Sequence, residues 1–196
     1  MALTPSTMLP LGTKAPDFIL PDVTSGGKSI SIKMYAAKKA ILLMFISVHC
    51  PYVQHVKHEL AKLGRDYQNK DIAIIAMSAN DVDRYPDDSP ESLKKMSEEL
   101  GFTFPICYDE TQTTTQDYMA ACTPDFFLFD QNRKLVYRGQ LDDSRPDSGK
   151  PVTGKDLRAA MDAVLVDKPV DPNQKPSMGC NIKWKPGNEP EYFGAH

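Results

Sequence analysis

The stretch Ala40-Ile-Leu-Leu-Met-Phe-Ile-Ser-Val-His-Cys-Pro-Tyr-Val53 decides the fold of this chain of 196 residues. Its first seven residues are continuously apolar, which is typical of a central strand covered on both faces. Pro51 suits the first position of a helix, and apolar residues then recur at helical spacing as far as Leu63. Cys50 is therefore expected at the junction where a buried strand ends and a helix begins.

Further along the chain, apolar runs at 72–77 and 126–129 predict two more buried strands. A fourth strand at 134–139 follows the turn Asp130-Gln-Asn-Arg133, so these last two strands are expected to pair antiparallel. The run Phe104-Pro-Ile-Cys-Tyr108 is apolar and strand-like. Its cysteine, Cys107, is expected in the core.

Two more helices are predicted between these strands. Ser89 and Pro90 can cap and open the first, and Gly101 stands where a glycine commonly ends a helix. Thr153, with Asp156 three residues later, resembles a capping box at the start of the second. The alternation of strands and helices predicts an α/β fold, with a central mixed sheet flanked by helices.

The two ends of the chain differ from this pattern. A β-rich N-terminal extension is expected before residue 40. From Lys168 onward the chain has no helical periodicity and holds five of its 16 prolines. We expect one domain over residues 1–166 and an irregular C-terminal tail over 167–196, which is either disordered or docked on the domain.

Composition narrows the function. Lys and Arg number 23 against 26 Asp and Glu, a near balance that argues against a nucleic-acid surface. No apolar run approaches the roughly 20 residues of a membrane span, and the N-terminus does not resemble a secretory signal. The four scattered cysteines favour a reducing, cytoplasmic setting. No nucleotide-binding glycine pattern is present, so no organic cofactor is expected.

Cys50 is the strongest candidate for chemistry. Unpaired N–H groups and the dipole at the start of a helix stabilise a thiolate relative to a thiol, and pKa values at such sites fall to about 3.5–7.5. The thiolate is the nucleophile in disulfide exchange and in peroxide reduction. The position therefore predicts a reactive cysteine rather than an inert core one.

Topology brings other segments to the same edge of the sheet. If the strand at 126–129 runs antiparallel to the first two strands, it begins where they end, and Cys122-Thr-Pro124 lies opposite Cys50. The next strand returns to that edge and delivers the loop at 141–151. The acidic stretch Asp81-Val-Asp-Arg-Tyr-Pro-Asp-Asp88 is expected to be a solvated loop.

Several motifs resemble the thioredoxin superfamily, specifically its AhpC/TSA (peroxiredoxin-like, redoxin) branch, over roughly residues 10–166. They are Ala15-Pro-Asp-Phe18, His49-Cys-Pro-Tyr-Val53, Cys122-Thr-Pro-Asp-Phe126 and the terminal Gly179-Cys-Asn-Ile-Lys-Trp-Lys185. The resemblance implies a thioredoxin fold in which Pro124 follows a cis peptide bond and, with Thr123, shapes the groove beside the reactive thiol.

The preferred hypothesis is a thiol–disulfide oxidoreductase that acts on a protein or small-molecule disulfide. A thioredoxin Cys-x-x-Cys motif would need a cysteine at position 53, which is Val53. Another thiol must therefore resolve the bond that Cys50 forms. Cys122 is near Cys50 by topology, and Cys180 lies on a tail long enough to fold back, so both stay candidates.

Two alternatives remain open. A thiol peroxidase would use Ser47 and Cys50 in the family's Pro-x-x-x-Thr/Ser-x-x-Cys pattern, although Leu43 stands in place of the proline. Arg145 is the candidate for its arginine partner. A non-enzymatic metal-binding module would use His49, Cys50 and Cys122 as nitrogen and sulfur ligands. In an enzyme, His49 could instead stabilise the thiolate or donate a proton.

Overall fold

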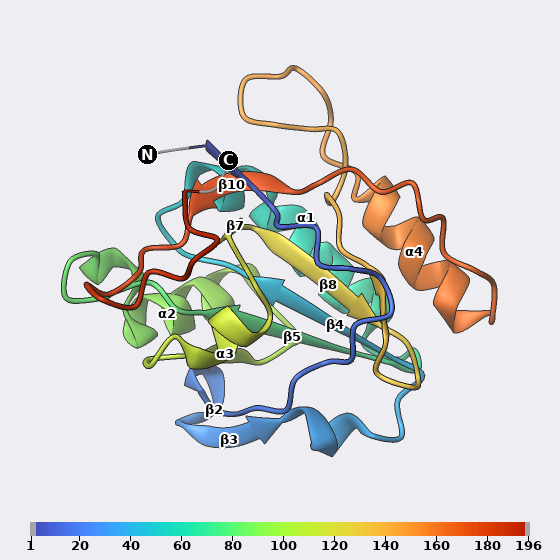
Figure 1. Cartoon of the computed structure of the whole chain (residues 1–196), viewed down its shortest axis with the longest axis horizontal. Coiled ribbons are helices and arrows are strands. Elements are labelled where there is room, and N and C mark those ends of the chain that lie inside the picture. The colour runs from blue at the N-terminus through green and yellow to red at the C-terminus, as the bar shows by residue number, and fades with distance from the viewer. Residues whose placement is uncertain (1–2, 195–196) are drawn as a thin grey trace.

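A computed structural model describes residues 3–194, which form a mixed α/β fold around a seven-stranded sheet (Figure 1). The order across the sheet is β3-β2-β6-β5-β4-β8-β9. The strands are β2 (Ile19–Asp22), β3 (Lys28–Ser31), β4 (Ala40–Phe45), β5 (Ile72–Ser78), β6 (Ile106–Tyr108), β8 (Asp125–Phe129) and β9 (Leu135–Tyr137). The expected central mixed sheet is confirmed.

The strand directions that the sequence predicted are also confirmed. β4 pairs parallel with β5 and antiparallel with β8, and β8 continues antiparallel into β9. Every residue of β4 and β5 is buried, which explains their unbroken apolar sequence. The end of β4 and the beginning of β8 therefore meet at one edge, where Phe45 pairs with Asp125.

Helices cover the faces of this sheet. They are α1 (Pro51–Tyr67), α2 (Pro90–Leu100), the short α3 (Thr113–Asp117) and α4 (Lys155–Leu165). Single 3-10 turns lie at Val23–Ser25, Ile32–Tyr35 and Pro86–Asp88. Leu42 and Met44 pack with α1, α2 and α4 on one face, and Leu43 packs with the N-terminal strands on the other. This alternation is the ordinary pleat of a buried strand.

The predicted helix ends are partly correct. The Ser89 side chain accepts the Ser92 N–H at 3.2 Å, and Gly101 ends α2 with φ 66°. The predicted capping box at Thr153 is wrong, because α4 begins at Lys155, after Gly154. The Asp142 carboxylate accepts the N–H groups of Thr153 and Gly154 at 2.7 Å each. A residue distant in sequence thus takes the place of a local cap.

The C-terminal tail docks on the domain. Its strand β10 (Met178–Asn181) pairs antiparallel with β1 (Leu3–Pro5) and with β7 (Cys122–Thr123) in a separate three-stranded sheet. In Figure 1 the tail runs from α4 back to β10, beside the start of α1. Ile182 and Trp184 are 2% and 4% exposed and join the core. The tail is irregular only in part.

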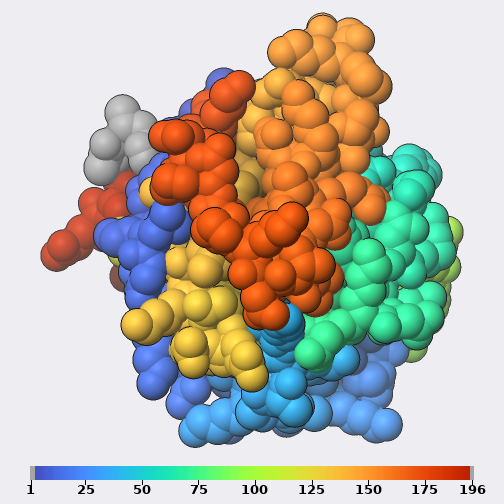
Figure 2. Space-filling view, turned by 90° about the vertical axis from the view of Figure 1, so that its right-hand side faces the viewer, coloured from blue at the N-terminus to red at the C-terminus, as the bar shows by residue number. Residues whose placement is uncertain are grey.

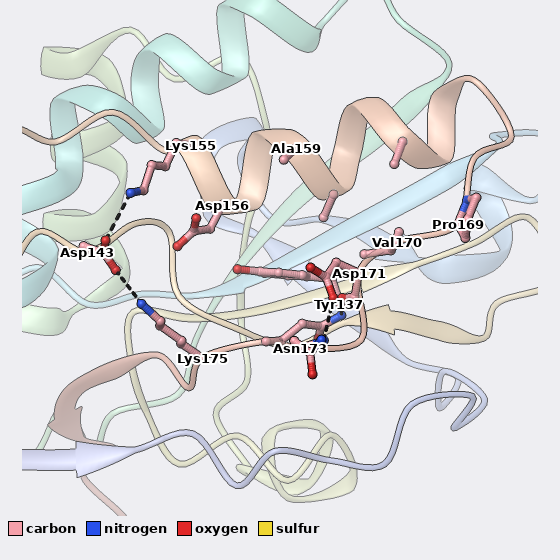
Figure 3. Close-up of a pocket in the computed structure, with 13 residues that line it drawn as sticks. Tyr137, Asp143, Lys155, Asp156, Ala159, Pro169, Val170, Asp171, Asn173 and Lys175 are labelled. Atoms are coloured by element: carbon pink, nitrogen blue, oxygen red, sulfur yellow. Dashed lines mark hydrogen bonds and ion pairs between the residues drawn. The ribbon is translucent and has the colours of Figure 1, made fainter.

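Between α4 and β10 the tail forms a strap over residues 169–175, which lies across the surface in Figure 2. The strap and α4 enclose a cavity of about 400 Å³ (Figure 3). Asp143 forms ion pairs with Lys155 at 3.0 Å and Lys175 at 3.3 Å, so it ties the strap to the helix. Among residues 3–194 no helix is both long and apolar enough to span a bilayer.

Candidate active site

Cys50 lies where the sequence predicted it, after β4 and directly before the first residue of α1, Pro51. Its side chain is 0% exposed, which the sequence did not predict. In its protonated form the Cys50 thiol donates a hydrogen bond to the Thr123 carbonyl at 3.1 Å. The Thr123 hydroxyl in turn lies 3.1 Å from Ser47 Oγ. Residues 47–50 and the segment around Thr123 therefore meet at the sheet edge, as predicted.

The peptide bond between Thr123 and Pro124 is cis, as the family resemblance implied. The Pro124 carbonyl accepts the Ser177 hydroxyl at 2.6 Å, so the tail is attached here by a side chain as well as by the pairing of β10 with β7. Thr123 and Pro124 thus form one wall of the site, and the tail closes it from outside.

Cys180 is the second sulfur of the site. In the register of β10 and β7 it pairs directly with Thr123, so both side chains lie on the same face. Its thiol hydrogen-bonds to the Cys50 sulfur. The structure thus brings together two cysteines that are far apart in sequence, and the tail that carries one of them covers the other.

Hydrogen bonding decides the ionisation of this pair. The Cys180 thiol is the largest influence that lowers the pKa of Cys50 well below the ordinary cysteine value. The Thr123 hydroxyl and the backbone N–H groups of Val53 and Cys180 lower it further, against the opposing effect of burial. Because Cys180 donates its proton to that thiolate, its own pKa is raised. The geometry therefore favours one thiolate and one thiol.

Cys122 has a different environment. It pairs with Asn181, one residue along from the pairing of Cys180 with Thr123, so it lies on the opposite face of the small sheet. Burial is the main cause that raises the pKa of its thiol well above the ordinary value, and the Asp125 carboxyl adds to it. Cys107 is buried in β6 as predicted, and burial raises its pKa to about 12.

His49 faces away from the sulfur pair. Its Nδ1 is bonded to the Asp88 carboxylate, and its ring stacks on Tyr85 with centroids 5.7 Å apart. Asp88 is 0% exposed and also accepts the N–H groups of Val48 and His49 at 2.7 and 3.1 Å. The solvated loop expected at 81–88 is therefore correct for residues 82–87, which are exposed or half-buried, and wrong at its buried ends, Asp81 and Asp88. Asp88 is buried because its carboxylate accepts the backbone N–H groups that lead into Cys50.

The Arg145 side chain is held by hydrogen bonds to its own loop. Its guanidinium donates within its own loop, to the Asp142 and Ser144 carbonyls at 2.8 and 2.6 Å and to Gln140 Oε1 at 2.7 Å. The loop does return to the predicted edge, where Arg145 and Pro124 line the same small cavity. These hydrogen bonds make Arg145 a support of the loop.

The metal-binding hypothesis has no matching geometry. Within the described range, 3–194, no group of three or more His, Cys, Asp or Glu side chains is arranged to hold a metal ion. His49 faces Asp88, Cys50 faces Thr123 and Cys180, and Cys122 lies on the other side of β7. The three proposed ligands therefore point in different directions.

Two features of the site were not identified from the sequence. Asn80 joins the Asp88 network to the tail, since its amide donates to Asp88 at 2.7 Å and its oxygen accepts the Lys183 N–H at 2.8 Å. A Cβ on Gly179 would lie 2.0 Å from the Thr123 carbonyl oxygen. The motif Gly179-Cys180 was the one available signal, because a glycine beside a reactive cysteine often permits a close backbone approach.

Comparisons with known proteins agree with this geometry. A family model described as Redoxin matches residues 10–157. Two curated proteins, both called thiol-disulfide oxidoreductase ResA, match at low identity. That of Geobacillus thermodenitrificans is 26% identical over 67% of this chain and 70% of its own length. That of Halalkalibacterium halodurans is 25% identical over 64% of this chain and 65% of its own length.

Solved structures are similar over nearly the whole chain. A conserved protein of Geobacillus kaustophilus is 52% identical with a TM-score of 0.93, over 95% of this chain and 98% of that one. A protein of Sinorhizobium meliloti is 46% identical with a TM-score of 0.91, over 94% of this chain and 100% of that one. The thioredoxin domain of a Bacteroides vulgatus oxidoreductase shares the fold at 22% identity, with a TM-score of 0.55 over 66% and 88%. The expected thioredoxin-like fold is therefore confirmed.

Proposed function

Because this chain belongs to the Redoxin family, we propose that it is a thiol–disulfide oxidoreductase in which Cys50 is the nucleophile and Cys180 the resolving thiol. The observation that carries the proposal is the hydrogen bond between the two sulfurs at the start of α1. The curated relatives named as thiol-disulfide oxidoreductases support the same reaction class.

The reaction proceeds by two exchanges. The Cys50 thiolate attacks one sulfur of a protein or small-molecule disulfide, and the other substrate sulfur leaves as a thiolate and takes up a proton. Cys180 then loses its proton and attacks the Cys50 sulfur, which forms the Cys50–Cys180 bond and releases the first substrate sulfur. Two electrons pass to the substrate, and an external thiol reductant returns them to the two cysteines.

The register of β10 favours Cys180 over Cys122 as the resolving thiol. Cys180 hydrogen-bonds to Cys50 and shares a face with Thr123, whereas Cys122 lies on the other face and is fully buried. We therefore assign the resolving role to Cys180 and not to Cys122.

The burial of Cys50 has a consequence for substrate entry. Cys50 and Cys180 are 0% and 4% exposed, and β10 lies over the first of them. A substrate disulfide therefore reaches the Cys50 sulfur when β10 separates from β7. Two residue pairs join these strands, and the opening must also break the hydrogen bonds from the Ser177 hydroxyl to the Pro124 carbonyl and from the Ile182 N–H to the Ala121 carbonyl.

The test mixes fully reduced protein with excess oxidised glutathione and follows the masses of the products. The parent is expected to form a Cys50–Cys180 bridge, and Cys180→Ser to accumulate a mixed disulfide between Cys50 and one glutathione. Cys50→Ser should form neither species. Cys122→Ser, the matched control, should behave as the parent does.

Two outcomes would refute the assignment. If Cys50→Ser still forms an intramolecular disulfide as fast as the parent, Cys50 is not the nucleophile. If Cys180→Ser still forms an intramolecular disulfide with Cys50, another thiol is the resolving one. A parallel reaction with hydrogen peroxide tests the peroxidase alternative, in which Cys50 first becomes a sulfenic acid. Oxidation of Cys50 by peroxide at the rate of an ordinary free thiol would argue against that alternative.

A further inference from the structure

Lys183 is a buried cation three residues after Cys180, and its ammonium is bonded to Asn181, the residue next to Cys180. The residue is 6% exposed, and its ammonium donates to the carbonyl and to the side-chain oxygen of Asn181 at 2.7 and 3.0 Å. Over residues 3–194, its ammonium forms no ion pair with a carboxylate. A charge removed from water in this way is unfavourable unless a negative group faces it.

The backbone of Lys183 fixes the position of this charge. Its N–H donates to Asn80 Oδ1 at 2.8 Å, and its carbonyl accepts the Asp81 N–H at 2.8 Å and Gln112 Nε2 at 3.0 Å. These three bonds come from two separate segments of the domain. The location of Lys183 is therefore set by the fold and not by contact with solvent.

The groups that face Lys183 come from each neighbouring segment. Its ammonium lies 5.7 Å from the ring centroid of Tyr85, and that ring stacks on His49, the residue before Cys50. In their ionised forms, Cys180 and Cys50 raise the pKa of Lys183, and the Asp88 carboxylate raises it less. Burial lowers the pKa of Lys183, and these anionic groups oppose that change.

Asp88 is the weakest of the three negative groups that act on Lys183. Its two oxygens are occupied by the His49 ring, by the Asn80 amide and by two backbone N–H groups. The sulfur pair acts on Lys183 more strongly than Asp88 does, and in its singly ionised form it carries one full charge.

We propose that Lys183 is a positioning residue whose buried ammonium holds the Cys50–Cys180 pair in the form with one thiolate. The inference deepens the proposed function and rests on it for the use made of that thiolate. The charge itself is a separate physical property. It can be measured without any substrate.

The test is a titration of the reduced protein, read from the ultraviolet absorbance of its thiolate, with Cys50→Ser as the blank that identifies the signal. Lys183→Met keeps much of the apolar stem and removes the charge. It should raise the pH of the first deprotonation by about 1 unit or more, as expected for the loss of an opposite charge nearby. Lys183→Arg should restore the parent value.

The matched control is Lys185→Met, two residues along the same segment, which should titrate as the parent does. Lys183→Gln provides a second neutral variant in case methionine disturbs the fold, and circular dichroism checks both. A parent-like titration in folded Lys183→Met or Lys183→Gln would overturn the proposal. So would Lys183→Arg titrating like the neutral variants, because a purely structural role would then explain the result.

The glutathione reaction separates this inference from the proposed function. If the titration shifts as expected but no variant or parent forms the Cys50–Cys180 bridge, the electrostatic role of Lys183 stands and the oxidoreductase assignment fails. If the bridge forms but the titration does not respond to Lys183, the assignment stands and this inference fails.

Discussion

Asp125 follows the cis proline Pro124 and is a buried acid close to the buried thiol of Cys122. Its ionisation can be compared with that of Cys50. Asp125 and Cys50 are both 0% exposed, yet their pKa values shift in opposite directions. Burial raises the pKa of Asp125 to about 7, because the hydrogen bonds to its carboxylate do not compensate for the loss of water. At Cys50 the hydrogen-bond donors lower the pKa by more than burial raises it. The balance between burial and hydrogen bonding, and not exposure alone, decides which of the two acids is ionised.

Asp125 is expected to make stability depend on pH. Between about pH 4 and pH 7 the folded chain keeps a proton that the unfolded chain has released, so this group lowers the free energy of unfolding as the pH rises. The slope is roughly 1.4 kcal/mol per pH unit. Asp125→Asn cannot titrate, so the variant should become more stable relative to the parent across this window.

Urea unfolding of variant and parent at several pH values measures that difference. Cys50, with its lowered pKa, contributes stability that rises with pH over part of the same range, but it is present in both proteins and cancels in the comparison. Asp117→Asn, a change at an exposed aspartate, is the control. A stability difference between Asp125→Asn and parent that stays constant from pH 4 to 7 would contradict the prediction.

At the scale of elements, β10 is a short strand held by contacts that a single methyl group can disturb. A Cβ on Gly179 would lie 2.0 Å from the Thr123 carbonyl oxygen and 2.6 Å from its carbon. Both atoms belong to backbone, so they cannot move aside as a flexible side chain could. The close pairing of β10 with β7 therefore requires glycine at this position.

Gly179→Ala should displace β10 from β7 and uncover Cys50. We expect alkylation of Cys50 by iodoacetamide to become several-fold faster, while formation of the Cys50–Cys180 bridge becomes slower because Cys180 moves with the strand. Mass spectrometry of the alkylated peptides measures the first effect. Gly187→Ala lies in the same tail with open space around its Cβ. Its φ of 87° strains the local turn, but the change does not touch the pairing of β10 with β7, so neither rate should change. Equal alkylation rates in Gly179→Ala and parent would show that the strand tolerates the methyl group.

At the scale of the whole molecule, the proposed disulfide would connect a helix start in the first half of the chain to a strand near its end. The bridge from Cys50 to Cys180 closes a loop of about 130 residues, which greatly restricts the unfolded chain. The reduced form is stabilised in a different way, since hydrogen bonds to the Cys50 thiolate exist only in the fold.

The oxidised protein is expected to be more stable than the reduced protein, by at most about 4–5 kcal/mol on the chain-entropy argument. Guanidinium unfolding of both forms near pH 5, where the thiolate stabilises the reduced form least, should give the largest difference. Cys180→Ser cannot close the bridge, so its stability should be the same under oxidising and reducing conditions. Equal stability of the two forms of the parent would exclude a Cys50–Cys180 bridge under those conditions.

The sequence by itself determined the central sheet and the location of Cys50. Strands such as β4 are buried on both faces, and this leaves an unbroken apolar run that can be recognised locally. Pro51 marks the start of α1 for an equally local reason, its fixed backbone angle and missing N–H. The meeting of Cys50 with Thr123 followed from strand direction, which the short turn before β9 restricts.

Only the tertiary structure decided what surrounds the sulfur of Cys50. Cys180 bonds to this sulfur from a segment distant in sequence, and the sequence offered it only as one of two candidates. Asp88, which is bonded to His49, and Lys183 have no local pattern that marks them as part of the site. Thr153 is a similar case, because its predicted cap was displaced by the carboxylate of Asp142. Burial and hydrogen bonding between remote segments depend on how the chain packs, and residue type and spacing carry that information only where the partners are neighbours in the chain.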